Sequence, residues 1–235
     1  MAFFIYNIKY SFLGLLVLSF IIARIPFVGK YFKVVNTLIH ESGHSLMTLF
    51  TNGQVIKVEL FADTSGTTIT KSKSKFGQFM IAFAGYPFAS LVGYLFVFLI
   101  FNGYFSAILI TIGIIAIVNL IFFIRNAHGI FWTISFTALI FLNFRYGSMV
   151  TTVIFATVIC AITLFESLWS SLVITIMSFR KSKSAGDATN LSKLTHIPAL
   201  IWALFFLALA SFVVYKAVLL YLSFDFSALQ TKLTL

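Results

Sequence analysis

Long apolar stretches alternate with short polar segments along the whole chain. Many of these stretches can cross the hydrocarbon core of a bilayer, which takes about 20 helical residues. The pattern predicts an all-α polytopic membrane protein with about seven transmembrane helices, within a range of six to eight. The predicted helices cover residues 11–28, 34–50, 76–101, 104–124, 130–143, 148–179 and 197–222.

One segment follows a different pattern. Residues 54–61 alternate between apolar and polar side chains, and a turn-forming Asp-Thr-Ser-Gly sequence and a β-branched stretch come next. Alternation with a period of two beside a turn predicts a small β-hairpin at about 54–70. A polar loop at about 180–196 precedes the last predicted helix. We therefore expect a single membrane-embedded domain over residues 1–235.

The composition makes lipid the solvent for most of the chain. Hydrophobic residues make up 60% of it and charged residues only 9%, whereas about a quarter of the residues of a soluble domain are charged. The single cysteine, Cys160, excludes both a disulfide framework and a cysteine-rich zinc cluster. The lipid bilayer is thus the first expected partner.

The net charge of +10 comes from lysines and arginines in short loops. They form no basic stripe interleaved with aromatic residues, so we expect no nucleic-acid partner. With seven helices, one side of the membrane collects Lys9, Lys57, Lys71, Lys73, Lys75, Arg125, Arg180, Lys181, Lys183 and Lys193. The excess of positive charge predicts that this side, with the N-terminus, is cytoplasmic in a multi-pass protein of the cell membrane.

Candidate chemistry is concentrated in the second predicted helix, where His40, Glu41 and His44 form an H-E-x-x-H motif. Histidines four residues apart share one face of a helix and can hold one Zn²⁺ ion. The glutamate between them can act as general base towards a zinc-bound water. A purely structural role, in which the three side chains pair with neighbouring helices, is less favoured because ionisable groups are costly within a membrane.

The neighbourhood of this motif resembles the start of the site-2 protease family. The resemblance rests on residues 40–46, the Asn-Gly pair at 52–53, the strand-like segment 55–61 and the Ser-Gly pair at 65–66. The closer similarity is to the compact bacterial branch, described as peptidase-like, and it extends over most of residues 36–205. Three later blocks carry it, at residues 84–87, 125–129 and 186–202.

The resemblance implies an intramembrane zinc protease in a bacterial membrane, acting on peptide or membrane-protein substrates. It assigns His40 and His44 as zinc ligands and Glu41 as general base. The sequence departs from the family pattern at the third ligand, which site-2 proteases take from an Asp-Gly pair in a later membrane helix. Asn119 begins a similar region here, but His128-Gly129 stands near the place of the Asp-Gly pair.

Catalytic zinc needs three protein ligands and a water, so another residue has to complete the site. Asp187 is our first choice because it is acidic and lies in one of the matching blocks. An equally reasonable interpretation is that Asp187 caps the start of a helix. His128 is the alternative third ligand, and its plainer interpretation is an interfacial histidine beside Arg125.

Other polar residues in predicted helices have less specific interpretations. Glu166 is expected to pair with Arg145 or Lys216 rather than bind metal. Asn119 and Asn126 are poor zinc ligands, and we consider them as hydrogen-bond donors to a substrate strand or to the oxyanion.

Seven antiparallel helices create a geometric conflict. They place His40 near the outer face and Asp187 on the cytoplasmic side. One metal ion could then contact both only if helix 34–50 is partly re-entrant or the 180–196 loop dips into the membrane.

Two functions therefore remain open. The first is a zinc metalloprotease that hydrolyses peptide bonds at membrane depth. The second is a non-proteolytic zinc-binding membrane protein, such as a regulator or scaffold, which the missing Asp-Gly pair favours. A transporter is disfavoured because the sequence shows no internal repeat.

Overall fold

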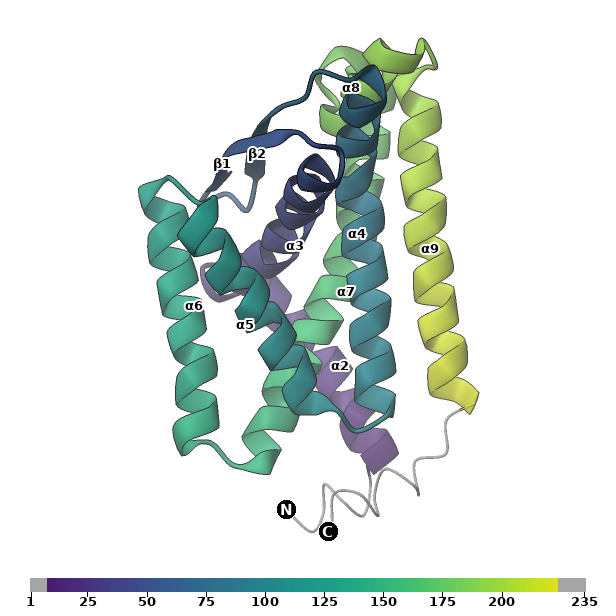
Figure 1. Cartoon of the computed structure of the whole chain (residues 1–235). Coiled ribbons are helices and arrows are strands. Elements are labelled where there is room, and N and C mark those ends of the chain that lie inside the picture. Colours follow the sequence, from purple (N-terminus) through teal and green to yellow (C-terminus); the bar gives the residue numbers. More distant parts are fainter. Residues whose placement is uncertain (1–7, 224–235) are drawn as a thin grey trace.

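A computed structural model describes residues 8–223 of the chain, which are mostly helical and carry one two-stranded sheet (Figure 1). The helices and strands are α2 (Ile8–Arg24), α3 (Val28–Phe50), β1 (Gln54–Leu60), β2 (Gly66–Lys71), α4 (Lys75–Phe101), α5 (Phe105–Phe122), α6 (Ala127–Tyr146), α7 (Met149–Arg180), α8 (Gly186–Thr195) and α9 (Ala199–Ser223). A 3₁₀ turn at Ser182–Ser184 links α7 to α8.

Five of the described helices are long and apolar enough to cross a membrane, namely α4, α5, α6, α7 and α9. They confirm the predicted helical class and support a multi-pass membrane protein, but they do not confirm the count of about seven spans. The difference lies in α2 and α3. The described part of helix α2 has 17 residues, and α3 buries a polar face that includes Asn36, Glu41 and His44.

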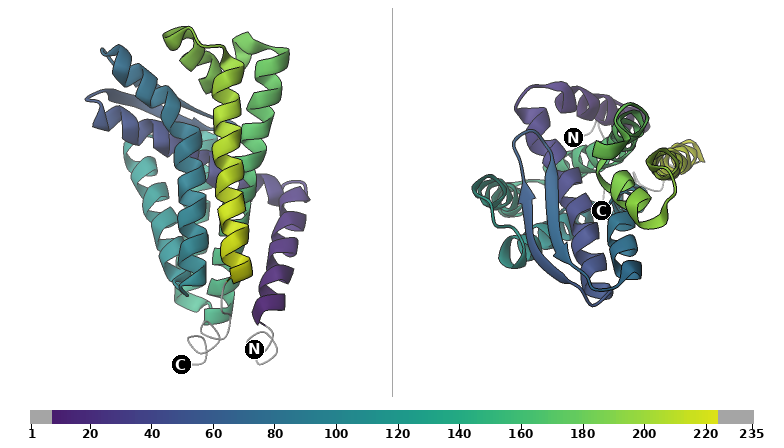
Figure 2. Two further views of the ribbon diagram at one scale, coloured as in Figure 1. Left: turned by 90° about the vertical axis from the view of Figure 1, so that its right-hand side faces the viewer. Right: turned by 90° about the horizontal axis from the view of Figure 1, so that it is seen from above.

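Helix α3 does not run back antiparallel to α2, but turns away from its end at a steep angle and continues across the bundle (Figure 2). Pro26 interrupts the helix between them and Phe27 has a positive φ of 67°, so the chain bends there. Helix α3 then runs obliquely to the end of the bundle that carries the hairpin, α8 and the start of α4, which we call the hairpin end. Helix α2 begins at the opposite end, so the conflict of the seven-helix arrangement does not arise.

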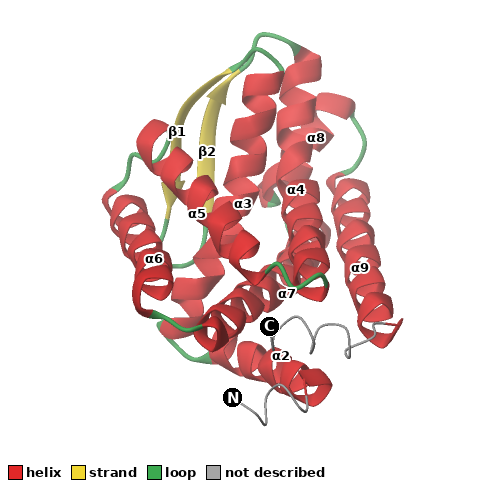
Figure 3. Cartoon of the chain, turned by 60° about the horizontal axis from the view of Figure 1, so that its bottom comes forward, coloured by secondary structure: helices red, strands yellow, loops and turns green. Residues whose placement is uncertain are grey.

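The predicted β-hairpin is confirmed as an antiparallel pair, β1 with β2. The outer edge of β1 is occupied, because Val58 N donates to Phe123 O at 2.8 Å and Arg125 N donates to Val58 O at 3.1 Å. Strand β2 lies between β1 and α3 (Figure 3). The hairpin therefore places its second strand against the helix that carries the H-E-x-x-H motif.

Candidate metal centre

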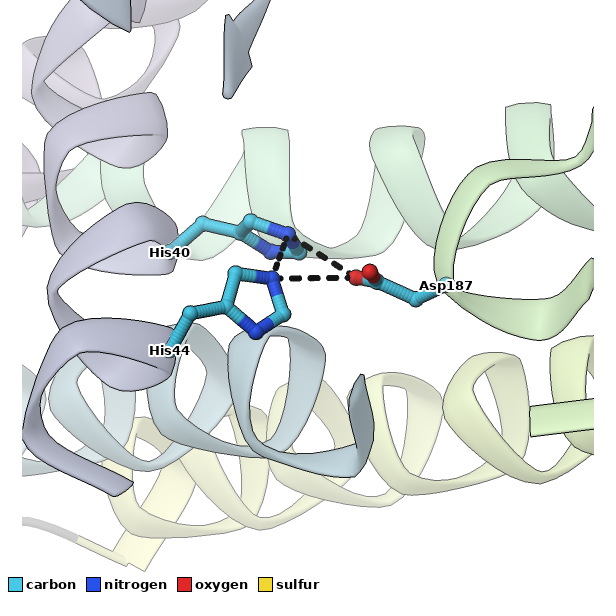
Figure 4. Close-up of side chains that lie close together, drawn as sticks. All are labelled: His40, His44 and Asp187. Carbon is cyan, nitrogen blue, oxygen red and sulfur yellow. Dashed lines mark hydrogen bonds and ion pairs between the residues drawn. The ribbon is translucent and has the colours of Figure 1, made fainter. Parts of the chain in front are cut away.

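Two elements bring three possible metal ligands together (Figure 4). His40 and His44 lie one turn apart on α3, and Asp187 lies in the first turn of α8. Oδ2 of Asp187 is 3.2 Å from Nε2 of each histidine, and the two Nε2 atoms are 3.1 Å apart. Among the described residues, these three form a group of ligand atoms that could hold a metal ion.

The donor set fits zinc in chemistry and in spacing. Two imidazole nitrogens and a carboxylate oxygen are ordinary ligands of catalytic zinc, which leaves its fourth position to water. Donors about 2.0–2.2 Å from a tetrahedral zinc stand roughly 3.3 Å from one another. The observed separations of 3.1–3.2 Å are close to that spacing. Small shifts would therefore suffice to ligate the ion.

Contacts from α4 orient the two imidazoles. Nδ1 of His44 lies 2.7 Å from the carbonyl oxygen of Ile81. Since a carbonyl only accepts, Nδ1 carries a proton, and Nε2 is left as the nitrogen directed at the metal position. The ring of Tyr86 packs edge-on against His40, with ring centroids 4.6 Å apart. The backbone and one aromatic ring of α4 thus set the geometry of the pair.

The site also depends on a glycine, Gly85 of α4, because a side chain at this position would collide with the imidazoles. A Cβ atom there would lie 2.5 Å from Cε1 of His40 and 2.6 Å from Nε2 of His44. On α3, a Cβ at Gly43 would lie 2.8 Å from Cβ of Phe88. The two glycines let α3 and α4 approach closely, and Gly85 leaves room for the imidazoles directly against the α4 backbone.

Glu41 is buried on α3, where it faces the hairpin. The hydroxyl of Thr68 on β2 donates to its Oε2 atom at 2.6 Å. Gly66 lies so close that a Cβ there would be 2.7 Å from Oε1. Strand β2 therefore holds the carboxylate of the candidate general base in a fixed position.

Asp187 is held by the way α8 packs. The N-cap residue of α8 is Ala185, so Asp187 is not the helix cap. Thr189 accepts a hydrogen bond from Ala185 N and donates one to Ser182 O, and the fully buried Leu191 anchors the helix. Burial alone raises the pKa of the Asp187 carboxyl, but the charge of His44 and the hydrogen bonds from both imidazoles outweigh it and hold that pKa below its usual range. The group is thus kept as the carboxylate that metal binding requires.

The other site residues predicted from the sequence, His128, Asn126 and Asn119, lie away from the metal centre. Nδ1 of His128 donates to Leu60 O at 3.1 Å, and the Asn126 amide donates to Leu60 O and accepts from Leu60 N. The Asn119 amide is buried and donates to Ser42 Oγ at 2.9 Å. None of the three lines the cavity at the metal centre. Their visible contacts tie β1 to α6 and α5 to α3.

Glu166 pairs with a residue that the sequence did not suggest. Its Oε1 atom lies 3.0 Å from Nζ of Lys33, rather than near Arg145 or Lys216. Lys33 precedes His40 by two helical turns and so shares its face of α3. The two-turn spacing from His40 is the sequence signal that could have identified Lys33.

Sequence reasoning also missed the contacts of Thr68 and Gly85 with the H-E-x-x-H motif, because these contacts depend on how the hairpin and α4 pack.

A single cavity of about 1880 Å³ includes the metal centre. It lies between α3 and β2 on one side and α7 and α8 on the other. His40, Glu41, His44 and Asp187 line it together with Thr68. The candidate base and all three candidate ligands are therefore reachable from one space.

Comparison with known families finds a family model that covers most of the chain. The model of the family described as peptidase M50B-like matches residues 13–217. No curated protein and no solved structure matches the chain.

Proposed function

The chain belongs to the peptidase M50B-like family, a site-2 protease family, and we propose on that premise that it is an intramembrane zinc metalloprotease. Its substrates would be peptide bonds of membrane-associated polypeptides. The observation that carries the proposal is the triangle of Nε2 of His40, Nε2 of His44 and Oδ2 of Asp187, with sides of 3.1–3.2 Å.

His40, His44 and Asp187 would hold the zinc ion. When bound, zinc acts as a Lewis acid that lowers the pKa of a water molecule to about 7. The Glu41 carboxylate would take up a proton from the attacking water and pass it to the departing amide nitrogen. Thr68 keeps the carboxylate oriented, and Tyr86 and Ile81 keep the imidazoles in place.

Peptide cleavage requires an extended substrate, and the unpaired edge of β2, which runs beside α3, borders the cavity where one could lie. Residues 123–125 occupy the outer edge of β1, and β2 lies beside the cavity with Thr68 on Glu41. We propose that a substrate strand aligns with β2 and so brings its scissile bond past the base.

The hairpin end is proposed to face the cytoplasm. Most basic residues lie at this end, namely Lys57, Lys71, Lys73, Lys75, Arg125, Arg180, Lys181, Lys183 and Lys193. The positive-inside rule then favours the cytoplasm for the hairpin and α8. Because α2 begins at the opposite end, this arrangement puts the start of α2 on the other side of the membrane, contrary to the predicted cytoplasmic N-terminus.

The second function, a zinc-binding regulator or scaffold without protease activity, rests on the absence of the Asp-Gly pair. Asp187 weakens this argument, because its carboxylate lies 3.2 Å from both imidazoles and could serve as the third ligand. We therefore favour the protease.

The test is cleavage of a library of transmembrane peptides by the purified chain in detergent, followed by mass spectrometry. Glu41→Gln should retain zinc but lower the cleavage rate by about 10²–10⁴-fold, because it removes the base. Glu59→Gln is the matched control, since Glu59 pairs with Lys57 on β1 and should be dispensable. Cleavage that persists in Glu41→Gln would refute the assignment, and bound zinc without any turnover in the wild type would favour the scaffold.

A further inference from the structure

Three exposed lysines line the cavity of the metal centre at the hairpin end. Lys71 ends β2, Lys73 lies between β2 and α4, and Lys193 lies on α8. They come from two separate parts of the chain that border the same space. We call Lys71, Lys73 and Lys193 the lysine rim.

The described part of the chain supplies no carboxylate to neutralise the lysine rim. Each acidic residue between 8 and 223 is engaged elsewhere: Glu41 with Thr68, Glu59 with Lys57, Asp63 with Ser65, Glu166 with Lys33, and Asp187 with the two histidines. The ion pairs found in these residues do not include a rim lysine. Three positive charges at one cavity are therefore available to a counter-charge from outside.

Lys71 and Lys193 lie at similar distances along the chain from the residues of the candidate site, one on each side of the cavity. Lys71 follows Thr68, which contacts Glu41, by three residues of extended strand, or about 10 Å. Lys193 follows Asp187 by six helical residues, or about 9 Å. An extended peptide advances roughly 3.3 Å per residue. A residue about three positions from the scissile bond would therefore reach the rim.

We propose that the lysine rim binds an acidic segment of the substrate, about three residues from the bond that is cut. The identity of that peptide as a substrate rests on the proposed protease function, whereas its binding does not. Like charges around a cavity with low-dielectric walls focus the field, so they attract acidic chains and accelerate their association. Rim charges of this kind act mainly on association rate and salt dependence.

Anionic lipid headgroups are the competing source of negative charge. Lys75, Lys181 and Lys183 lie at the same end of the molecule but do not line the cavity. They would meet headgroups at least as well as the rim does. The location of the rim inside the cavity that holds Glu41 and Asp187 therefore favours a polypeptide.

Binding of a fluorescein-labelled Gly-Ser peptide with a run of glutamates, measured by anisotropy on the full chain in uncharged detergent, tests the proposal. The variant Lys71→Gln/Lys73→Gln/Lys193→Gln should bind about tenfold more weakly at low salt, and the difference should shrink as salt rises. Lys75→Gln/Lys181→Gln/Lys183→Gln removes the same charge at the same end and should stay within about twofold of the wild type. A peptide with glutamines in place of glutamates should bind weakly to all three proteins.

Three results would overturn the proposal: equal weakening in both triple variants, no preference for the glutamate peptide, or displacement of that peptide by monomeric short-chain phosphatidylglycerol. Zinc content and thermal melting show whether each variant is folded. The assay needs no turnover and can be repeated in Glu41→Gln, so a failure of the protease function would appear only in the cleavage assay.

Discussion

Oδ2 of Asp187 lies 3.2 Å from Nε2 of His44, across the contact between α8 and α3. The candidate third ligand thus comes from a short helix rather than from one of the five apolar helices that could cross a membrane. Its position depends on the packing of α8, which buries Ala188 and Leu191 completely. Zinc binding and the docking of α8 should therefore be coupled.

Gly85→Ala should weaken zinc binding strongly, because its Cβ would collide with both imidazoles. The nearest atoms are ring atoms of His40 and His44, so the rings would have to leave their positions. We expect zinc affinity to fall by about 10–100-fold or more, as when the supporting contacts of a metal site are lost. Metal analysis of the purified variant measures this.

Gly93→Ala is the matched control, on the same helix two turns later. A Cβ there would meet Leu164 at 3.5 Å, an ordinary van der Waals contact. Equal loss of zinc in both variants would mean that Gly85 serves only general packing of α4.

Thr68→Val should slow cleavage without loss of zinc. It removes the hydroxyl that donates to Oε2 of Glu41 at 2.6 Å and keeps the shape of the side chain. We expect kcat to fall by about 10–100-fold, because the base loses its orienting contact. Thr67→Val changes the exposed neighbour on β2 and should have wild-type kinetics. A normal kcat for Thr68→Val would show that β2 does not position the base.

The sequence predicted well the features that depend on apolar length and periodicity. The predicted spans 76–101, 104–124 and 148–179 correspond closely to α4, α5 and α7, and the hairpin lies where the alternation placed it. These patterns record directly which surface meets lipid or the protein interior.

The path of the first two helices could not be predicted in the same way. Pro26 marks an interruption of the helix. The sequence alone does not show whether it separates two antiparallel membrane spans or bends a single crossing of the membrane. Packing of α2 against α7, through contacts such as Ala23 with Val158 and Ile162, belongs to the tertiary fold. The partner of Glu166 was missed for the same reason. For the metal centre, the structure brings Asp187 rather than His128 to the histidines, and the ligand role itself stays a prediction.

Lys33→Met should destabilise the protein by about 3–5 kcal/mol, because it leaves the mostly buried carboxylate of Glu166 without its partner. The double variant Lys33→Met/Glu166→Leu should recover most of that loss, since it removes both charges. Thermal or denaturant unfolding of the single and double variants measures the difference. Equal destabilisation in both would mean that the ion pair itself contributes the stability.

Thiol labelling should reveal the orientation in the membrane. Cys160 is buried, so an introduced surface cysteine can be labelled selectively. In intact bacterial cells, a membrane-impermeant maleimide should label Tyr146→Cys, at the end opposite the hairpin, and should leave Ser182→Cys unlabelled until the cells are opened. The reverse pattern would place the hairpin end outside.

The most direct test of the account is the zinc content of the purified chain and two single variants. The wild type should carry about one zinc per chain, and Asp187→Ala should lose most of it, because two histidines alone hold catalytic zinc poorly. His128→Ala should retain zinc at the wild-type level, since His128 contacts Leu60 instead. Full zinc in Asp187→Ala, or its loss in His128→Ala, would contradict the metal centre described here.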